Sequence, residues 1–156
     1  LVGWNETATR FPADACTHAL FEQQAARTPD QLAVIYEGHP TRLTYRELSA
    51  QKNRLAHHLR GLGVGPGSLV GIHLERSPAM IVALLAVLAA GAGYVPLDLA
   101  YPERRIAFMI EDTGMAALVT DAALARRLPA AGVPLVCLDA DADAIARCPA
   151  TALPVS

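Results

Sequence analysis

A serine in the first half of the chain stands where many α/β enzymes carry a nucleophile. Glu75, Arg76 and Ser77 follow the apolar run 69–74, and α/β folds place their sites at the carboxyl ends of strands. Ser77 lacks the Gly-x-Ser-x-Gly surroundings of a hydrolase nucleophile. Pro78 follows it, and a serine before a proline is typical of a helix start. We therefore expect Ser77 to cap a helix.

A carboxylate closes the next apolar run of the chain. Asp98 follows residues 94–97, and Arg104 and Arg105 come shortly after it. This position is also the end of an expected strand, but the three side chains form no complete catalytic set. The pattern predicts a local Asp–Arg ion pair that fixes the loop.

A glycine-rich stretch, residues 61–67, invites comparison with phosphate-binding loops. Such loops follow a strand and precede a helix, so that the helix N-terminus faces the phosphate. Here the glycines follow a helical pattern and precede a strand pattern, and Pro66 breaks the spacing of a dinucleotide-binding motif. We predict a helix end and a turn.

The acidic residues and the histidines give no pattern of metal ligands. Asp139, Asp141 and Asp143 match the first half of a calcium loop. Such a loop also requires Gly at its sixth and Glu at its twelfth position, where this chain has Ala144 and Ala150. We expect an exposed acidic loop. The five histidines, which also lack ligand spacing, are His18, His39, His57, His58 and His73.

The elements that must position these residues alternate between strands and helices. Apolar β-prone runs predict strands over 32–36, 42–45, 69–74, 94–97, 117–120 and 135–138. Helical spacing and start signals predict helices over 16–27, from 44 into the glycine-rich stretch, over 77–90 and 101–112, and a short one over 121–129. This order predicts an α/β fold with a mostly parallel sheet flanked by helices.

Two local signals near residue 44 refine this prediction. Residues 32–45 are expected to form a hairpin whose turn is 37–40, and Thr44 with Glu47 has the form of a capping box. The helix that follows has an apolar face made of Leu48, Leu55, Leu59 and Leu62.

The composition excludes several classes of protein. Of 156 residues, 53% are hydrophobic and 18% are charged, with a formal net charge of -2, which argues against a disordered chain and against a nucleic-acid binder. The apolar run 79–90 is shorter than the roughly 20 residues of a membrane span, so we expect a fully buried helix there. The N-terminus has no signal-peptide pattern. Three widely spaced cysteines, Cys16, Cys137 and Cys148, fit a reducing cytoplasm.

Three segments resemble one family. Residues 43–48, Leu-Thr-Tyr-Arg-Glu-Leu, resemble the first core motif of adenylation domains in nonribosomal peptide synthetases, and residues 88–98, Leu-Ala-Ala-Gly-Ala-Gly-Tyr-Val-Pro-Leu-Asp, resemble the second. Residues 98–105 are similar to the Asp-Pro-x-Tyr-Pro-x-x-Arg run that follows. The departures are Ala89 for Lys, Gly93 for Ala and Leu99 for Pro. Residues 4–7 resemble the linker that joins an upstream condensation domain to an adenylation domain.

The resemblance implies a division of the chain into three parts. Residues 1–14 would be the interdomain linker. Residues 15–139 would be the first part of the N-terminal subdomain of the adenylate-forming fold, which acyl-CoA synthetases and luciferases share. Residues 140–156 would be a loop that leads to the phosphate-binding motif of the family.

The resemblance also implies the chemistry of a complete domain. Such a domain activates an amino acid with ATP and Mg and passes the aminoacyl group to a phosphopantetheine thiol on a carrier protein. The family binds the ATP phosphates with a loop of the form Ser-Gly-Ser/Thr-Thr-Gly-x-Pro-Lys-Gly, which these 156 residues do not contain. Lys52, the single lysine, lies in an early helix and does not match the catalytic lysine of the family. No matched position carries a catalytic, cofactor-binding or metal-binding residue.

Three functional hypotheses follow from this sequence. In the first, the chain is part of an amino-acid-adenylating domain, is inactive alone, and has the rest of that domain and a carrier protein as partners. In the second, it is a non-catalytic interaction platform whose residues 1–27 dock on a condensation domain. The third, a complete small nucleotide-binding protein, is disfavoured by the missing phosphate loop. Neither a nucleic acid nor a membrane is an expected partner.

Overall fold

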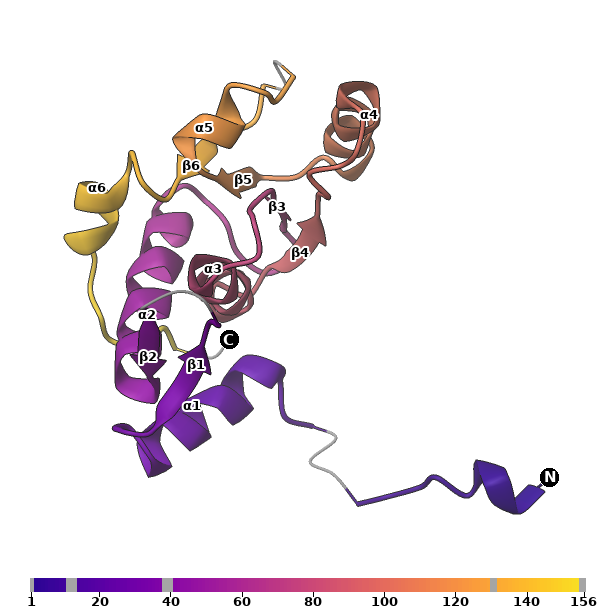
Figure 1. Cartoon of the computed structure of the whole chain (residues 1–156), viewed down its shortest axis with the longest axis vertical. Helices are drawn as coiled ribbons and strands as arrows, with labels where there is room; N and C mark the ends of the chain where they lie inside the picture. The colour runs from indigo at the N-terminus through magenta and orange to yellow at the C-terminus, as the bar shows by residue number, and fades with distance from the viewer. Residues whose placement is uncertain (1, 11–13, 38–40, 130–131, 155–156) are drawn as a thin grey trace.

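The computed structural model describes residues 2–10, 14–37, 41–129 and 132–154. Their centre is a parallel four-stranded sheet with the order β4-β3-β5-β6 (Figure 1). The strands are β3 (Leu69–Ile72), β4 (Gly93–Pro96), β5 (Ala117–Thr120) and β6 (Leu135–Cys137). The expected α/β fold with a parallel sheet is confirmed.

The helices between these strands lie on both faces of the sheet, as right-handed crossovers require. The chain passes from β3 to β4 in one direction and from β4 back across β3 to β5 in the other. The intervening helices, α3 (Pro78–Ala89) and α4 (Glu103–Thr113), therefore pack on opposite faces. The short helix α5 (Ala122–Ala125) connects β5 to β6 and borders a cavity shared with α4.

The side chains of the strands divide the core into two parts. Val70 and Ile72 of β3 and Val119 of β5 belong to the larger cluster, which includes α3. Leu69 and Leu118 lie on the other face, in the cluster that includes α4. This alternation with a period of two places apolar side chains on both faces of the sheet, which explains why the strands are almost continuously apolar.

The helix α2 (Tyr45–Gly61) packs on α3 and closes the larger cluster from outside. Its capping box is present as predicted: the Glu47 amide donates to the Thr44 hydroxyl, and the Thr44 amide donates to the Glu47 carboxylate at 2.8 Å. Leu48, Leu55 and Leu59 are buried on its apolar face. The prediction for Leu62 is wrong. The helix ends at Gly61, so Leu62 is the C-cap residue and remains 43% exposed.

A hairpin and a further helix complete this side of the molecule. The strands β1 (Leu32–Ile35) and β2 (Arg42–Thr44) pair in antiparallel fashion, as predicted. Part of the predicted turn, residues 38–40, lies outside the described residues. The helix α1 (Thr17–Arg27) packs against α2 and α3.

The apolar run 79–90 forms α3 but is not buried all round. Ala79 is exposed and Ile81 is 39% exposed, whereas Ala83, Ala86 and Val87 are inaccessible. The helix covers one face of the sheet and is itself covered only partly, by α2 and α1. No helix among the described residues is long and apolar enough to cross a membrane.

The two ends of the described chain differ in their contacts. At the N-terminus a 3-10 helix, η1 (Val2–Asn5), lies apart from the body of the fold (Figure 1). At the other end, residues 140–156 were expected to be a loop but include a short helix, α6 (Ala142–Ala146), which contacts α2. Beyond it the chain follows α2: Asn53 donates to the Ala150 carbonyl at 2.7 Å, and His57 contacts the Thr151 carbonyl at 3.0 Å.

Candidate functional site

A cavity of about 350 Å³ lies at the carboxyl edge of the sheet. The connection after β3 leaves the sheet on the α3 face, whereas the connections after β4 and β5 leave on the opposite face. The carboxyl end of β3 is therefore a topological switch point, where α/β folds open a crevice. The lining residues come from the segments that follow these three strands: His73, Leu99, Tyr101, Glu103, Ile106, Leu124 and Arg127.

His73 is the buried polar residue of this cavity. It follows β3 directly, its amide donates to the Val119 carbonyl, and its side chain is 4% exposed. The ring Nδ1 lies 3.1 Å from the Leu97 carbonyl oxygen. A carbonyl only accepts, so Nδ1 carries the hydrogen and Nε2 has its lone pair free in the neutral ring. Within the described part of the chain, Nε2 has no hydrogen-bond partner.

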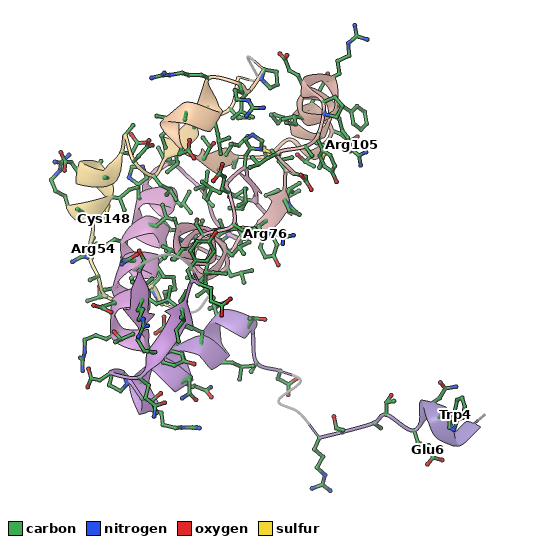
Figure 2. The ribbon with its side chains drawn as sticks, in the orientation of Figure 1. Trp4, Glu6, Arg54, Arg76, Arg105 and Cys148 are labelled. Atoms are coloured by element: carbon green, nitrogen blue, oxygen red, sulfur yellow. The ribbon has the colours of Figure 1, made fainter. Side chains whose placement is uncertain are left out.

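Two charges of opposite sign lie on the exposed side of the cavity. Glu103 begins α4 and Arg127 follows α5, and both are exposed. Among the described residues, neither forms an ion pair, with the other or with a third group. Nearby, Arg105, which is labelled on α4 in Figure 2, stacks on the ring of Tyr101, with its guanidinium carbon 4.1 Å from the ring centroid.

The two candidate strand-end groups of the sequence have structural roles. The Ser77 hydroxyl accepts from the Met80 amide at 3.3 Å, so Ser77 caps α3 as predicted. The predicted Asp98–Arg pair is wrong. Asp98 accepts from the Ala100 amide at 2.9 Å, a local turn that satisfies the carboxylate without an arginine.

The glycine-rich stretch is a helix end and a turn, as predicted. Gly63 and Gly67 have φ values of 88° and 81°, the left-handed region that glycine adopts without strain. The amide of Gly63 donates to the Arg60 carbonyl, and the Ser68 hydroxyl accepts from the Gly65 amide. These groups serve the chain itself and are not directed at a phosphate.

The acidic residues after β6 hold the backbone together. The carboxylate of Asp139 accepts from the Ala122 amide at 2.9 Å, and this bond holds the pKa of Asp139 below its usual value. Asp141 accepts from the Cys137 amide. Burial, followed by the charges of Asp141, Asp139 and Asp121, raises the pKa of the Cys137 thiol. The described residues contain no group of three potential ligands that could hold a metal ion.

Sequence reasoning missed a buried ion pair between α1 and α2. The side chain of Lys52 is only 1% exposed and contacts the carboxylate of Glu22, whose side chain is 31% exposed. The ammonium also lies 5.4 Å from the centroid of the Phe21 ring, a cation–π distance. Burial lowers the pKa of Lys52 to about 8. Burial, and secondarily the charge of Lys52, lowers the pKa of the neighbouring His18.

The fold and its motifs define a member of a family of nucleotide-dependent enzymes. Over residues 21–153 the chain matches the AMP-binding enzyme family, and it belongs to that family. It is 53% identical over 121 residues to the chondramide synthase cmdD from Chondromyces crocatus; the match covers 77% of this chain and 3% of the relative. It is 44% identical over 144 residues to tyrocidine synthase 3 from Brevibacillus parabrevis, over 92% of this chain and 2% of the relative. The chain thus spans a small part of the length of the curated relatives it matches.

Solved structures place the chain more closely within the family. A nonribosomal peptide synthetase, FmoA3, in its AMPPNP-bound form superposes with a TM-score of 0.85 at 35% identity, over 97% of this chain and 16% of that one. The N-terminal subdomain of Klebsiella oxytoca NpsA, in complex with 3-hydroxyanthranilyl-AMSN, superposes with a TM-score of 0.74 at 28% identity. The match covers 90% of this chain and 34% of that one. The chain is therefore a fragment of an adenylation domain of the nonribosomal peptide synthetase type.

Proposed function

We propose that this chain is the structural first part of a domain that activates an amino acid with ATP. The observation that carries the proposal is the likeness, over 97% of the chain, to a synthetase structure that binds the ATP analogue AMPPNP. The two core motifs of the sequence support it. Residues 43–48 contain the N-cap and first turn of α2, and residues 88–98 contain the end of α3, the turn after it and β4.

The proposed reaction has two steps. A carboxylate oxygen of the amino acid attacks the α-phosphorus of ATP, the bond to the β-phosphate oxygen breaks, and pyrophosphate leaves. The thiol of a carrier-protein phosphopantetheine then loses its proton to water and attacks the acyl carbonyl, and AMP leaves with the electron pair of the broken bond between the acyl carbon and the phosphate oxygen. None of the described residues is assigned a bond-making role in either step.

The part of this chain in that chemistry is to build and hold a scaffold. The parallel sheet with α2, α3 and α4 fixes the positions at which strands of the remaining domain would join. Among the described residues no cluster could hold a metal ion, so we do not propose that this chain coordinates the Mg of the parent enzyme. Phosphate binding is likewise assigned to residues beyond these 156, because the loop motif of the family is missing here.

A carrier protein and the rest of the domain are the proposed partners. The relatives are long synthetases, and one similar structure is an artificially fused adenylation–PCP di-domain from Klebsiella oxytoca. The domain division 1–14, 15–139 and 140–156 remains part of this proposal, and so does a cytoplasmic location.

An interaction role for the N-terminal segment is a second proposal. Trp4 is 84% exposed, and it lies with Glu6 on a segment that stands apart from the body of the fold (Figure 2). Large exposed aromatic side chains are typical anchors of interfaces. We propose that residues 1–27 dock on an upstream condensation domain. Trp4→Ala in the joined domains is expected to increase hydrogen exchange at that contact; unchanged exchange would refute this role.

Amino-acid-dependent exchange of pyrophosphate into ATP tests the main proposal. The complete adenylation domain that contains this chain is expected to catalyse exchange with one amino acid, or a few similar ones, from a panel of all common amino acids. Exchange that depends on a fatty or aryl acid instead, with no response to any amino acid, would overturn the assignment of the substrate class.

A further inference from the structure

The cavity at the carboxyl end of β3 has the chemistry of a ligand site that the proposed adenylation reaction does not use. We propose that it binds a small free α-amino acid with an apolar side chain, at a site separate from the one that forms the adenylate. Three independent features of the cavity lead to this ligand: an unpartnered histidine acceptor, two unpaired charges and an apolar floor.

The acceptor is Nε2 of His73, a residue that lines the cavity and whose Nε2 is not among the fully buried atoms. With Nδ1 donating to the Leu97 carbonyl, Nε2 offers a lone pair to the cavity, on a residue that is otherwise 4% exposed. An acceptor that a cavity leaves accessible and unpartnered can take a hydrogen bond from a ligand that enters the cavity, and such a bond to a charged donor contributes about 1.5–3 kcal/mol. An ammonium group, with three donors, is suited to this position.

The two unpaired charges select a ligand that carries both signs. Glu103 and Arg127 line the same cavity but do not pair with each other. A ligand ammonium can pair with the Glu103 carboxylate, and a ligand carboxylate can form two parallel hydrogen bonds with the Arg127 guanidinium. Each charged group of an α-amino acid then has a partner of opposite sign.

The floor and the size of the cavity define the side chain. Ile106 and Leu124 are 4% and 7% exposed and present apolar surface to the cavity. The volume of about 350 Å³ is near the lower end of the roughly 300–1,000 Å³ that ligand pockets occupy. An aliphatic side chain of the size of leucine suits this space.

A phosphate or a nucleotide suits the cavity less well. The Glu103 carboxylate would repel a phosphate, and Arg127 would be its single cationic partner among the lining residues. The glycine turns of the chain, at residues 61–67, precede β3 and so lie at the other edge of the sheet. The charge balance therefore favours a zwitterion over an anion.

Methyl NMR on the complete adenylation domain tests this site directly. With isotope-labelled isoleucine and leucine methyl groups, L-leucine is expected to shift the Ile106 and Leu124 signals in a saturable way. Two matched compounds each lack one charge: 4-methylpentanoate has no ammonium, and 3-methylbutylamine has no carboxylate. We expect each of them to bind at least about tenfold more weakly, because each loses one charge-assisted pair.

Substitutions on the exposed side identify the charges without disturbing the core. Arg127→Gln is expected to weaken L-leucine binding by roughly tenfold or more, while Arg126→Gln, the same change at the exposed neighbour that does not line the cavity, leaves it unchanged. On α4, Glu103→Gln is likewise expected to weaken L-leucine binding, while Glu111→Gln, which does not line the cavity, is its matched control.

The outcomes separate this site from the catalytic one. Three results would each overturn the proposal. They are absence of shifts at Ile106 and Leu124, equal binding of all three compounds, and an equal loss of L-leucine binding in Arg127→Gln and Arg126→Gln. Pyrophosphate exchange on the same preparation reports the adenylation reaction independently. A negative result at the cavity with intact exchange would therefore refute this inference alone.

Discussion

The buried pair of Lys52 and Glu22 gives a sharp prediction about stability. Lys52 is 1% exposed, and the fall of its pKa from 10.5 to about 8 corresponds to roughly 3 kcal/mol, at 1.36 kcal/mol per pH unit. At pH 7 the amine is still protonated, so the folded state contains a buried charge whose desolvation opposes folding. Glu22 offsets that cost only in part, because its side chain is 31% exposed.

The two halves of the pair should respond differently to substitution. Glu22→Gln leaves the ammonium buried without a counter-charge, and we expect a loss of about 2–3 kcal/mol in the free energy of unfolding. Lys52→Met keeps an unbranched chain of similar length and removes the charge. We expect it to cost less than Glu22→Gln, because the Glu22 side chain is 31% exposed and can be hydrated more readily than the ammonium of Lys52, which is 1% exposed.

The pH dependence follows from the same shift in pKa. Between pH 8 and 10.5 the folded state releases the Lys52 proton while the unfolded state still holds it. Stability rises with pH wherever the unfolded state binds more protons. As the pH rises through that range, the free energy of unfolding of the original protein should therefore increase, relative to that of Lys52→Met, by up to about 3 kcal/mol.

Urea unfolding of the complete domain, followed by circular dichroism from pH 7 to 10.5, measures these differences. Arg46→Gln is the matched control, because the Arg46–Asp30 pair is 64% and 81% exposed and such pairs contribute less than about 1 kcal/mol. Equal destabilisation by Lys52→Met and Glu22→Gln at pH 7 would refute the reasoning. So would a loss of stability, relative to Lys52→Met, between pH 8 and 10.5.

Four further predictions concern the fold. Thr44→Ala removes the capping box of α2 and should cost about 1 kcal/mol in urea unfolding, with Thr44→Ser close to the original. The Thr44 amide lowers the pKa of Glu47, so the stability from this carboxylate should be lost as the pH falls below 4.5, and acid titration of Glu47→Gln should lack that loss. Gly71→Ala places a Cβ 2.7 Å from the sulfur of Met115 and should cost about 1–3 kcal/mol, whereas Gly61→Ala, with nothing within 4 Å, should gain about 0.4–1 kcal/mol. The isolated chain should self-associate in light scattering, because its parallel sheet has open edges at β4 and β6; a stable monomer would contradict this.

Local signals in the sequence predicted local structure well. The capping box of Thr44 and the cap at Ser77 depend on residues three positions apart, and both are present. The motifs also indicated the family, which the comparisons confirm.

The contacts that the sequence analysis predicted wrongly or missed have a different physical origin. The Asp98 carboxylate could meet either a nearby amide or a nearby arginine, and sequence spacing does not decide between two short-range partners. The burial of Lys52 depends on α1 docking on α2, and the cavity around His73 depends on three strands and their crossovers. Contacts between elements distant in sequence leave no periodic signal. A single lysine within a helix whose neighbouring positions are buried was the one local hint of the ion pair.

Pyrophosphate exchange by the 156-residue chain itself tests the central claim most directly. If the chain is a scaffold that lacks the phosphate loop, it should give no amino-acid-dependent exchange of pyrophosphate into ATP, whereas the same residues within the complete domain should give exchange. Clear exchange by the chain alone, abolished by removing the amino acid, would contradict the account. It would mean that phosphate binding and catalysis reside in these residues themselves.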